Sequence, residues 1–230
     1  MNVVHLCDCM EFMKGIPDKY YELAIVDPPY GIGIVEQFKK TIKSNTSMFN
    51  LSNGIVGSEW DGSIPDESYF IELFRVSKNQ IVWGGNYFID YLHNTRAMVV
   101  WDKMNGTNPM ADAEIAWTSF DTSVRMFRMH HFSKGYGEKI HPTQKPVALY
   151  KWLLSRYAKP NDKIFDSHVG SGSIRIACHD MGFDFEGCEI DKDYWEAQEE
   201  RYNTHIQQSD LFSPEVMQEL IYQGASSGKQ

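Results

Sequence analysis

The sequence lacks any uninterrupted apolar run of about eighteen residues, the length that a membrane-spanning helix needs. Its first residues lack a basic stretch followed by a long apolar one, so no secretory signal is expected. Cysteine is scarce: the four residues form no CxxC pair, which predicts neither a disulfide framework nor a metal site. These absences predict a cytoplasmic protein with no membrane partner and with free thiols.

The chain also lacks an overall basic excess, because 31 acidic and 22 basic side chains give a net charge of −9. Indiscriminate binding to polyanions is therefore not expected. One segment differs, since residues 124–151 carry six basic side chains against one acid. Taken alone, this segment is equally consistent with a solvated surface and with a phosphate-binding face.

Enough apolar residues are present, 42% of 230, for one large α/β domain or two small ones. Short β-rich runs alternate with segments of helical period, which predicts a mainly parallel sheet covered on both faces. The predicted strands are 3–6, 23–26, 80–83, 97–101, 114–118, 124–129, 163–165 and 185–188. The predicted helices are 8–14, 67–76, 86–92, 146–157, 171–181, 194–206 and 214–222. Residues 31–63 and 129–145 read as long loops, and a loop of the first length is a functional lid or is disordered.

The first chemical motif is Asp27-Pro28-Pro29-Tyr30, directly after an apolar strand. Two prolines end the strand, which leaves Asp27 at a carboxyl end, where open α/β sheets bind their ligands. The Asp27 carboxylate and the Pro28 carbonyl can both accept hydrogen bonds from an exocyclic amino group, and Tyr30 offers a stacking face. An Asp-Pro-Pro sequence alone would favour an ordinary turn, but the preceding β-run, Tyr30 and the Gly-Ile-Gly that follows favour a site.

The second motif, 165–173, reads Phe-Asp-Ser-His-Val-Gly-Ser-Gly-Ser and again joins a strand to a helix. Its glycines allow a ligand to approach the backbone at a helix N-terminus, although a generic Gly-rich loop is weak evidence. Glu189 follows Gly170 by nineteen positions and ends the next strand, where nucleoside-binding folds place an acid on ribose hydroxyls. The pair predicts a cofactor with a ribose and no required pyrophosphate.

A third motif, His141-Pro142-Thr143-Gln144-Lys145-Pro146, precedes a predicted helix, and its spacing alone does not distinguish a site from a proline-bounded loop. Together the three motifs resemble the amino-group DNA methyltransferases that use S-adenosylmethionine, specifically the permuted β group. That family carries D-P-P-Y, H-P-T-Q-K-P and D-P-F-x-G-S-G-T in this order. Segments 6–11, 83–87 and 113–117 extend the resemblance over nearly the whole chain.

The resemblance implies a Rossmann-like, mainly parallel sheet of about seven strands, with an antiparallel strand near one edge and helices on both faces. It implies one methyltransferase domain over residues 1–230, with a mobile loop at 31–63 and a short DNA target-recognition insertion around 120–140. It allows a homodimer and a restriction-modification partner, in a prokaryotic or phage-encoded setting.

The resemblance also implies roles for individual residues. Asp27, Pro28, Pro29 and Tyr30 would hold and stack a base that is flipped out of duplex DNA. S-adenosylmethionine would be bound by Asp8, Thr143, Lys145, Asp166, Gly170, Gly172 and Glu189, with Asp8 on the adenine amino group and Glu189 on the ribose. DNA phosphates would be bound by Lys39, Lys40, Lys43, Arg125, Arg128, Lys134 and Lys139. No metal is implied.

One departure from the family is Ser167-His168, which replaces a proline and a phenylalanine that shape the cofactor pocket. We expect His168 to take the packing role of the phenylalanine. Adenine N6 is the expected target, because D-P-P-Y is commoner among adenine enzymes. An N4-cytosine enzyme and a catalytically silent DNA- or cofactor-binding homologue are the alternatives, and RNA or a free nucleotide is a less favoured substrate.

Overall fold

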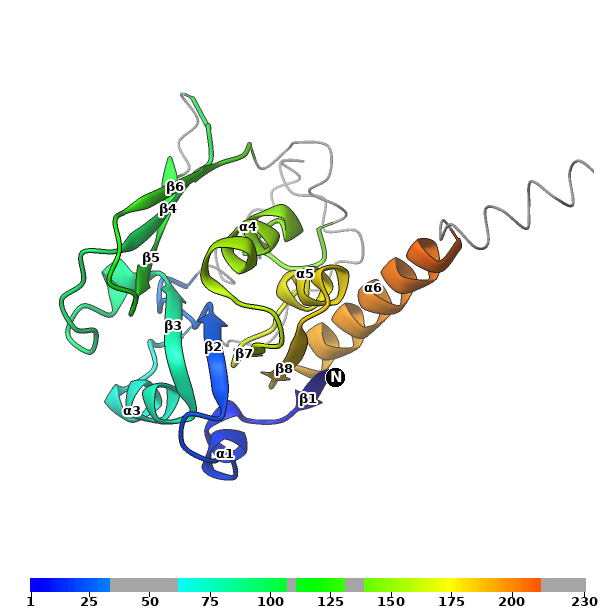
Figure 1. Cartoon of the computed structure of the whole chain (residues 1–230), viewed down its shortest axis with the longest axis horizontal. Coiled ribbons are helices and arrows are strands. Elements are labelled where there is room, and N and C mark those ends of the chain that lie inside the picture. The colour runs from blue at the N-terminus through cyan, green and yellow to red at the C-terminus, as the bar shows by residue number, and fades with distance from the viewer. Residues whose placement is uncertain (34–61, 107–110, 131–138, 212–230) are drawn as a thin grey trace, which may run out of the picture.

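The computed structural model describes residues 1–33, 62–106, 111–130 and 139–211, which form an eight-stranded sheet with helices on both faces (Figure 1). The strands are β1 (Asn2–Leu6), β2 (Tyr21–Val26), β3 (Ser77–Trp83), β4 (Met98–Asp102), β5 (Ala113–Thr118), β6 (Arg125–Arg128), β7 (Lys163–Asp166) and β8 (Asp184–Glu189). The helices are α1 (Cys9–Lys14), α3 (Glu67–Val76), α4 (Val147–Tyr157), α5 (Ser173–Met181) and α6 (Lys192–Leu211). No helix within these ranges is long and apolar enough to cross a membrane.

The strand order is β1-β8-β7-β2-β3-β5-β4-β6. Every neighbouring pair is parallel except the two that involve β5, which runs antiparallel to both β3 and β4. The predicted α/β class and mainly parallel sheet are therefore confirmed. The described strands number eight where about seven were expected, and the antiparallel strand lies third from the edge.

Each of the eight predicted strands forms, but the predicted helix 86–92 is wrong. In its place a single 3₁₀ turn, η1 (Gly85–Tyr87), follows Gly84, whose φ of 69° is in the left-handed region. The amide of Phe88 donates to Gly85 and that of Leu92 donates to Phe88, so the segment makes separate turns instead of a continuous helix. The predicted helix 214–222 and most of the predicted loop 31–63 lie outside the described residues.

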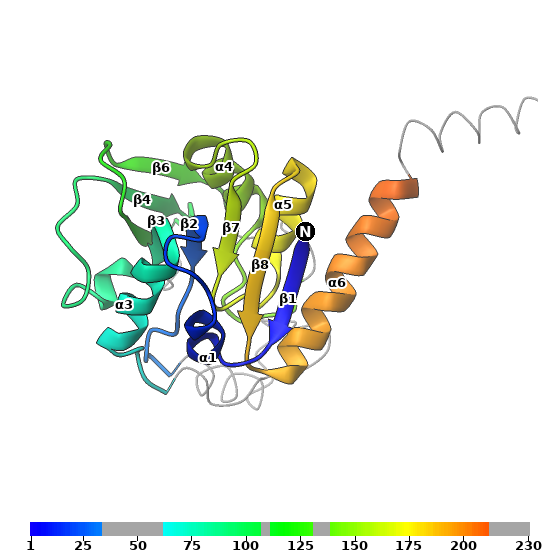
Figure 2. The same ribbon diagram turned by 60° about the horizontal axis from the view of Figure 1, so that its bottom comes forward.

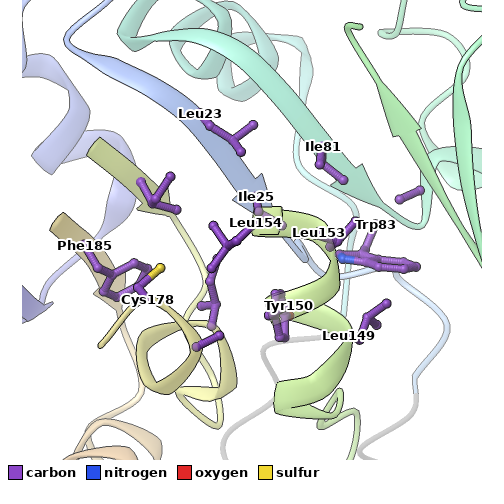
Figure 3. Packing of buried hydrophobic residues seen from close by; sticks show 14 of the residues in the cluster. Leu23, Ile25, Ile81, Trp83, Leu149, Tyr150, Leu153, Leu154, Cys178 and Phe185 are labelled. Carbon is purple, nitrogen blue, oxygen red and sulfur yellow. The ribbon is translucent and has the colours of Figure 1, made fainter. Parts of the chain in front are cut away.

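Two cores hold the helices to the sheet. Helices α1 and α3 cover one face, where Met13, Phe70 and Leu73 pack on β2 side chains, and α4 and α5 cover the other (Figures 1 and 2). Figure 3 shows Leu149 and Leu153 of α4 facing the strands, in a fully buried cluster with residues of β2 and β3. Alternation explains this arrangement, because successive residues of a strand point to opposite faces. The central strand β2 is consequently apolar on both sides.

The carboxyl ends of the parallel strands form one edge of the sheet. Asp27 follows β2, Trp83 ends β3, Asp166 ends β7 and Glu189 ends β8. Strand β5 begins at this edge because it is antiparallel, with Ala116 paired to Trp83. The fold therefore gathers the ends of several strands, distant in sequence, at the place where α/β sheets bind ligands.

Gly187 provides a test of how tightly this edge is built. It pairs with Asp166 across β7 and β8, and a Cβ there would lie 2.8 Å from the Asp166 carbonyl oxygen and 2.5 Å from Val169 Cγ2. We expect Gly187→Ala to lower the free energy of unfolding by about 1–3 kcal/mol, measured by urea denaturation. Gly15→Ala is the matched control: its φ of −83° suits alanine and its nearest neighbour is 3.6 Å away, so no loss is expected. Equal stability of the two variants would contradict this account of the strand pairing.

Candidate active site

Asp27 lies at the end of β2 and both of its carboxylate oxygens are held. The Tyr30 hydroxyl donates to Oδ1, and the Lys145 ammonium donates to Oδ2. Lys145 comes from the segment just before α4, 118 residues further along the chain. Because α4 packs its apolar face on β2 and β3, the same packing brings Lys145 to Asp27. The first and third sequence motifs therefore meet at one carboxylate.

The contact extends into a network of four charged residues, Asp27, Lys145, Glu114 and Lys103. The Lys145 side chain is only 1% exposed, and its Nζ lies 3.1 Å from Glu114 Oε2. Glu114 Oε1 in turn lies 2.5 Å from Lys103 Nζ. Cations and carboxylates thus alternate. A buried ammonium is costly unless it is paired, and here it has a carboxylate on each side.

Burial and neighbouring charges act in opposite directions on these groups. Burial alone would lower the pKa of Lys145, but Asp27 and Glu114 outweigh it and raise that pKa, so the side chain is a cation. Burial raises the pKa of Asp27, and the Glu114 charge adds to this effect while Lys145 opposes it. Burial also acts to raise the pKa of Glu114, but the charges of Lys145 and Lys103 prevail and lower it. Asp27 is thus the carboxylate of the network that takes up a proton more readily.

Tyr30 stands against a surface made by the segment after β3. Its ring stacks on Tyr87 with centroids 4.8 Å apart and planes 15° from parallel. Gly84 allows this approach, because a Cβ at that position would lie 2.2 Å from Tyr30 Cε1. Gly85 similarly leaves room for the Trp117 backbone and Cβ. Gly84 therefore lets the backbone pass directly beside the Tyr30 ring, and Gly85 lets it pass beside β5.

A cavity of about 250 Å³ opens beside Asp27 and extends over the ends of β7 and β8. Its lining comes from all three sequence motifs and from the start of α6. The lining residues are Asp27, Pro29, His141, Thr143, Gln144, Lys145, Tyr150, His168, Val169, Gly170, Ser171, Glu189, Ile190 and Tyr194.

Two acids lie at the strand ends on the far side of this cavity. Glu189 is held by backbone amides: Gly170 donates to Oε2 at 2.8 Å and Asp191 donates to Oε1 at 2.9 Å. Asp166 is buried below the loop and accepts from the His168 amide at 3.0 Å. Burial raises the pKa of Glu189, and it raises the pKa of Asp166 to about 8. Both acids are therefore placed to gain from a cationic or hydrogen-bond-donating ligand.

The His141–Pro146 motif is folded on itself by local hydrogen bonds. His141 Nδ1 accepts from the Thr143 amide at 3.3 Å, and Gln144 Oε1 accepts from the Ile140 amide at 3.0 Å. The His141 ring packs 4.2 Å from Tyr194, and burial lowers its pKa to about 3. Its role here is to shape the cavity wall as a neutral ring.

The structure brings most of the predicted catalytic and cofactor residues together. The cavity is lined by six of them: Asp27, Pro29, Thr143, Lys145, Gly170 and Glu189. Tyr30 contacts Asp27 through its hydroxyl. Pro28 and Asp166 are buried beside the cavity. Besides Asp166, two more of the predicted cofactor residues lie outside the lining. Asp8 caps α1 by accepting from the amides of Met10 and Glu11. Gly172 precedes α5 with a φ of 71° and approaches the Gln198 side chain.

The predicted phosphate-binding residues are spread more widely. Arg125 and Arg128 lie on the edge strand β6, where Arg128 pairs with Asp102 at 3.3 Å. Lys139 is partly buried, and burial together with the Lys103 charge lowers its pKa to about 8. Lys39, Lys40, Lys43 and Lys134 lie outside the described residues.

Sequence reasoning missed Glu114, Lys103 and Tyr69 as parts of the site. Glu114 could have been found only with the knowledge that β5 is antiparallel, which turns the start of that strand toward Asp27. Tyr69 comes from α3 and donates or accepts at Ser167 Oγ, 2.7 Å away. The described cysteines are free thiols, and the described residues hold no group of three potential metal ligands.

Comparisons with known proteins agree with this arrangement. Residues 99–200 match the sequence model of the DNA methylase family of N6 and N4 methyltransferases. The type II methyltransferase M1.MboII of Moraxella bovis is 23% identical, over 84% of this chain and 94% of its own length. The crystal structure of an M1.HpyAVI–SAM complex superposes with a TM-score of 0.58 at 19% identity, covering 88% of this chain and all of that one. The cytosine-N4-specific PvuII DNA methyltransferase superposes with a TM-score of 0.56 at 14% identity, covering 86% of this chain and 85% of its own.

Removing Lys145 tests the charge network. In Lys145→Met the Asp27 and Glu114 carboxylates lose their shared cation, and we expect a loss of about 3–5 kcal/mol in unfolding free energy near pH 8. Without the ammonium, the folded-state pKa of Asp27, already raised by burial, rises further, and that of Glu114 rises as well, so the folded state of the variant takes up protons on acidification. The loss should accordingly shrink between pH 8 and pH 5, as measured by urea denaturation against wild type at each pH.

Lys78→Met is the matched control, because Lys78 makes an ion pair with Glu22 while 51% exposed. We expect it to cost less than about 1 kcal/mol. If Lys145→Met lost as little unfolding free energy as Lys78→Met, or if its loss did not change with pH, the buried ammonium would not be paired with the Asp27 and Glu114 carboxylates as described.

Proposed function

We propose that this chain, a DNA methyltransferase of the N6/N4 amino-group family, transfers a methyl group from S-adenosylmethionine to the N6 amino group of an adenine flipped out of duplex DNA. The observation that carries the proposal is the position of Asp27. It stands between a neighbouring aromatic face, Tyr30, and a cavity that ends at Glu189. One carboxylate is thus placed to hold an amino group next to a bound nucleoside.

Asp27 and the Pro28 carbonyl would accept the two hydrogens of the target amino group. Although Tyr30 and Lys145 already donate to Asp27, a carboxylate offers about four acceptor sites, so the amine can be added to the existing contacts. Holding both hydrogens orients the nitrogen lone pair toward the cavity. As the nitrogen gains positive charge, the Asp27 carboxylate stabilises it and accepts the proton that the methylated amine loses.

Tyr30 would stack on the flipped base. Its ring already carries a planar partner, Tyr87, whose side chain is 42% exposed. Because this partner is exposed, a purine could replace it on the Tyr30 ring in the same stacked geometry. Unstacking a base from the duplex costs a few kcal/mol, and such stacking offsets part of that cost.

The cavity residues fit S-adenosylmethionine in the chemistry of their donors and acceptors. Glu189 would accept from the ribose hydroxyls, and Asp166 lies where a carboxylate would favour the cationic methionine end, with Thr143 and Gly170 lining the space between. A side chain at Gly170 would approach His141 Nε2 at 3.5 Å and narrow the same space. When bound, the cofactor supplies an electrophilic methyl group on its sulfonium.

Duplex DNA would be bound through phosphate contacts by Arg125, Arg128 and Lys139, supported by Lys39, Lys40, Lys43 and Lys134 outside the described residues. A homodimer and a restriction-modification partner belong to the same proposal, as does a cytoplasmic location beside the DNA. The M1.MboII relative, a type II methyltransferase of a bacterium, supports this setting.

The decisive experiment is a methylation assay on unmethylated mixed-sequence DNA, with the digested nucleosides analysed by mass spectrometry. We expect N6-methyladenine from wild type, and a rate at least about 10²-fold lower from Asp27→Ala, since the group that stabilises the developing charge is gone. Arg96→Gln is the control with full activity expected, because Arg96 is 72% exposed and its only ion pair among the described residues is with the exposed Asp121.

Each outcome of the assay has a distinct meaning. N4-methylcytosine would keep the mechanism and overturn adenine as the target. Cofactor binding without any methylated base, on DNA that covers all short sequences, would favour a catalytically silent homologue. Absence of cofactor binding in calorimetry would overturn the whole proposal.

Cofactor binding should also release protons. Because burial raises the pKa of Asp166 to about 8, this carboxyl is largely protonated at pH 7 in the free protein. The positive charges of S-adenosylmethionine favour the carboxylate, so binding lowers that pKa and expels a proton. Affinity should therefore rise between pH 6 and pH 7.5, by at most about tenfold per unit.

Calorimetry in phosphate and in Tris measures the released protons directly. Asp166→Asn should abolish most of the difference between the two buffers, whereas Asp18→Asn, at a side chain 76% exposed, should leave it unchanged. An identical binding enthalpy of wild type in both buffers would contradict the assignment of the proton to Asp166.

A further inference from the structure

Ser167 and His168 form part of a buried chain of hydrogen bonds that reaches the cavity wall. Ser167 Oγ lies 2.7 Å from the Tyr69 hydroxyl and 2.8 Å from His168 Nδ1. Tyr69 belongs to α3, 98 residues earlier, and is 3% exposed, as is Ser167. The His168 ring also packs edge-on against Tyr69, with centroids 5.5 Å apart. The substitution therefore brings polar contacts to a position where the resembling family has an apolar wall.

The direction of these hydrogen bonds follows from counting protons. Tyr69 has no acceptor other than Ser167 among the described residues, so the Tyr69 hydroxyl must donate to Ser167 or leave its proton unpaired in the core. An unpaired buried donor is costly. Ser167 then accepts from Tyr69 and uses its own proton for His168 Nδ1.

This order fixes the tautomer of His168. Burial lowers the pKa of His168 to about 4, so the ring is neutral near pH 7 and carries one proton. Since Nδ1 accepts from Ser167, the proton is on Nε2. Nε2 has no partner among the described residues, but it is not one of the buried polar atoms without a hydrogen bond. The His168 ring contributes to the lining of the cavity.

We propose that His168 donates a hydrogen bond from Nε2 to an acceptor atom of bound S-adenosylmethionine, with Ser167 and Tyr69 as positioning residues that hold the required tautomer. The inference rests on the proposed function, because it takes the occupant of the cavity from it. If His168 acted only by packing, it would form an aromatic wall as the phenylalanine of the resembling family does. The hydrogen bonds from Tyr69 through Ser167 instead make its Nε2–H a donor that faces the cavity.

Binding measurements separate these two roles. His168→Phe keeps an aromatic wall and removes the donor, and we expect the dissociation constant for S-adenosylmethionine to rise about three- to tenfold. His168→Gln, whose amide can place an N–H near the Nε2 position, should recover most of the affinity. Tighter or unchanged binding by His168→Phe would overturn the proposal.

A double-mutant cycle tests the positioning residues. Tyr69 lies outside the lining of the cavity. Tyr69→Phe should weaken S-adenosylmethionine binding in the wild-type background and have no effect in the His168→Phe background. Equal effects in both backgrounds would mean that Tyr69 acts only through packing. Thermal unfolding of each variant identifies any that fail to fold, and binding is compared only among folded ones.

A measurement without cofactor keeps this inference separate from the proposed function. Nitrogen-15 NMR of the free protein distinguishes the two imidazole tautomers, and we expect His168 to carry its proton on Nε2 in wild type and to lose this preference in Ser167→Ala. A proton on Nδ1 would overturn the inference whether or not the cofactor binds. Failure of wild type to bind S-adenosylmethionine, with the Nε2 tautomer present, would instead overturn the proposed function.

Discussion

The ion pair between Lys145 and Asp27 is the contact on which the site depends. It joins the end of β2 to the segment that starts α4, and Lys145 is buried only because carboxylates lie on both sides of it. Burial of an ammonium is tolerated here because Asp27 and Glu114 share its charge. The arrangement also leaves Asp27 less tightly neutralised than a single ion pair would, so the carboxylate retains acceptor capacity. One lysine therefore holds both carboxylates in place.

The fold could be predicted from the sequence because its signals are local. Short β-rich runs and helical periods locate the strands and most helices, and prolines and glycines mark their ends. The apolar spacing of segment 86–92 suits a helix, but the structure forms only a 3₁₀ turn at its start. Its actual course is set by Gly84, which takes a left-handed conformation so that the chain can pass beside Tyr30. A tertiary contact therefore overrode the local pattern.

The site was predictable only in part, for a similar reason. Asp27, Lys145 and Glu189 stand in recognisable motifs at strand ends, and the structure places them around one cavity. Glu114 depends on the direction of β5 and Tyr69 on the docking of α3, and neither is written in a short stretch of sequence. The family match to residues 99–200 likewise excludes Asp27. The pairing of β2 with β7 and the ion pair between Asp27 and Lys145 join the two halves of the site.

That pairing has a consequence for the order of events during synthesis. Strand β2 leaves the ribosome long before its neighbour β7, and β1 must wait for β8, its partner at the sheet edge. At about 5–20 residues per second, β1 and the edge of β2 that faces β7 stay unpaired for roughly ten seconds or more, although β3 can pair with the other edge of β2 earlier. For most of that interval Asp27 has no lysine partner, because Lys145 lies 118 residues further along the chain. The two strands that end at the cavity, β7 and β8, are thus the last of the described strands to be made, and a nascent chain has no complete site until both have left the ribosome.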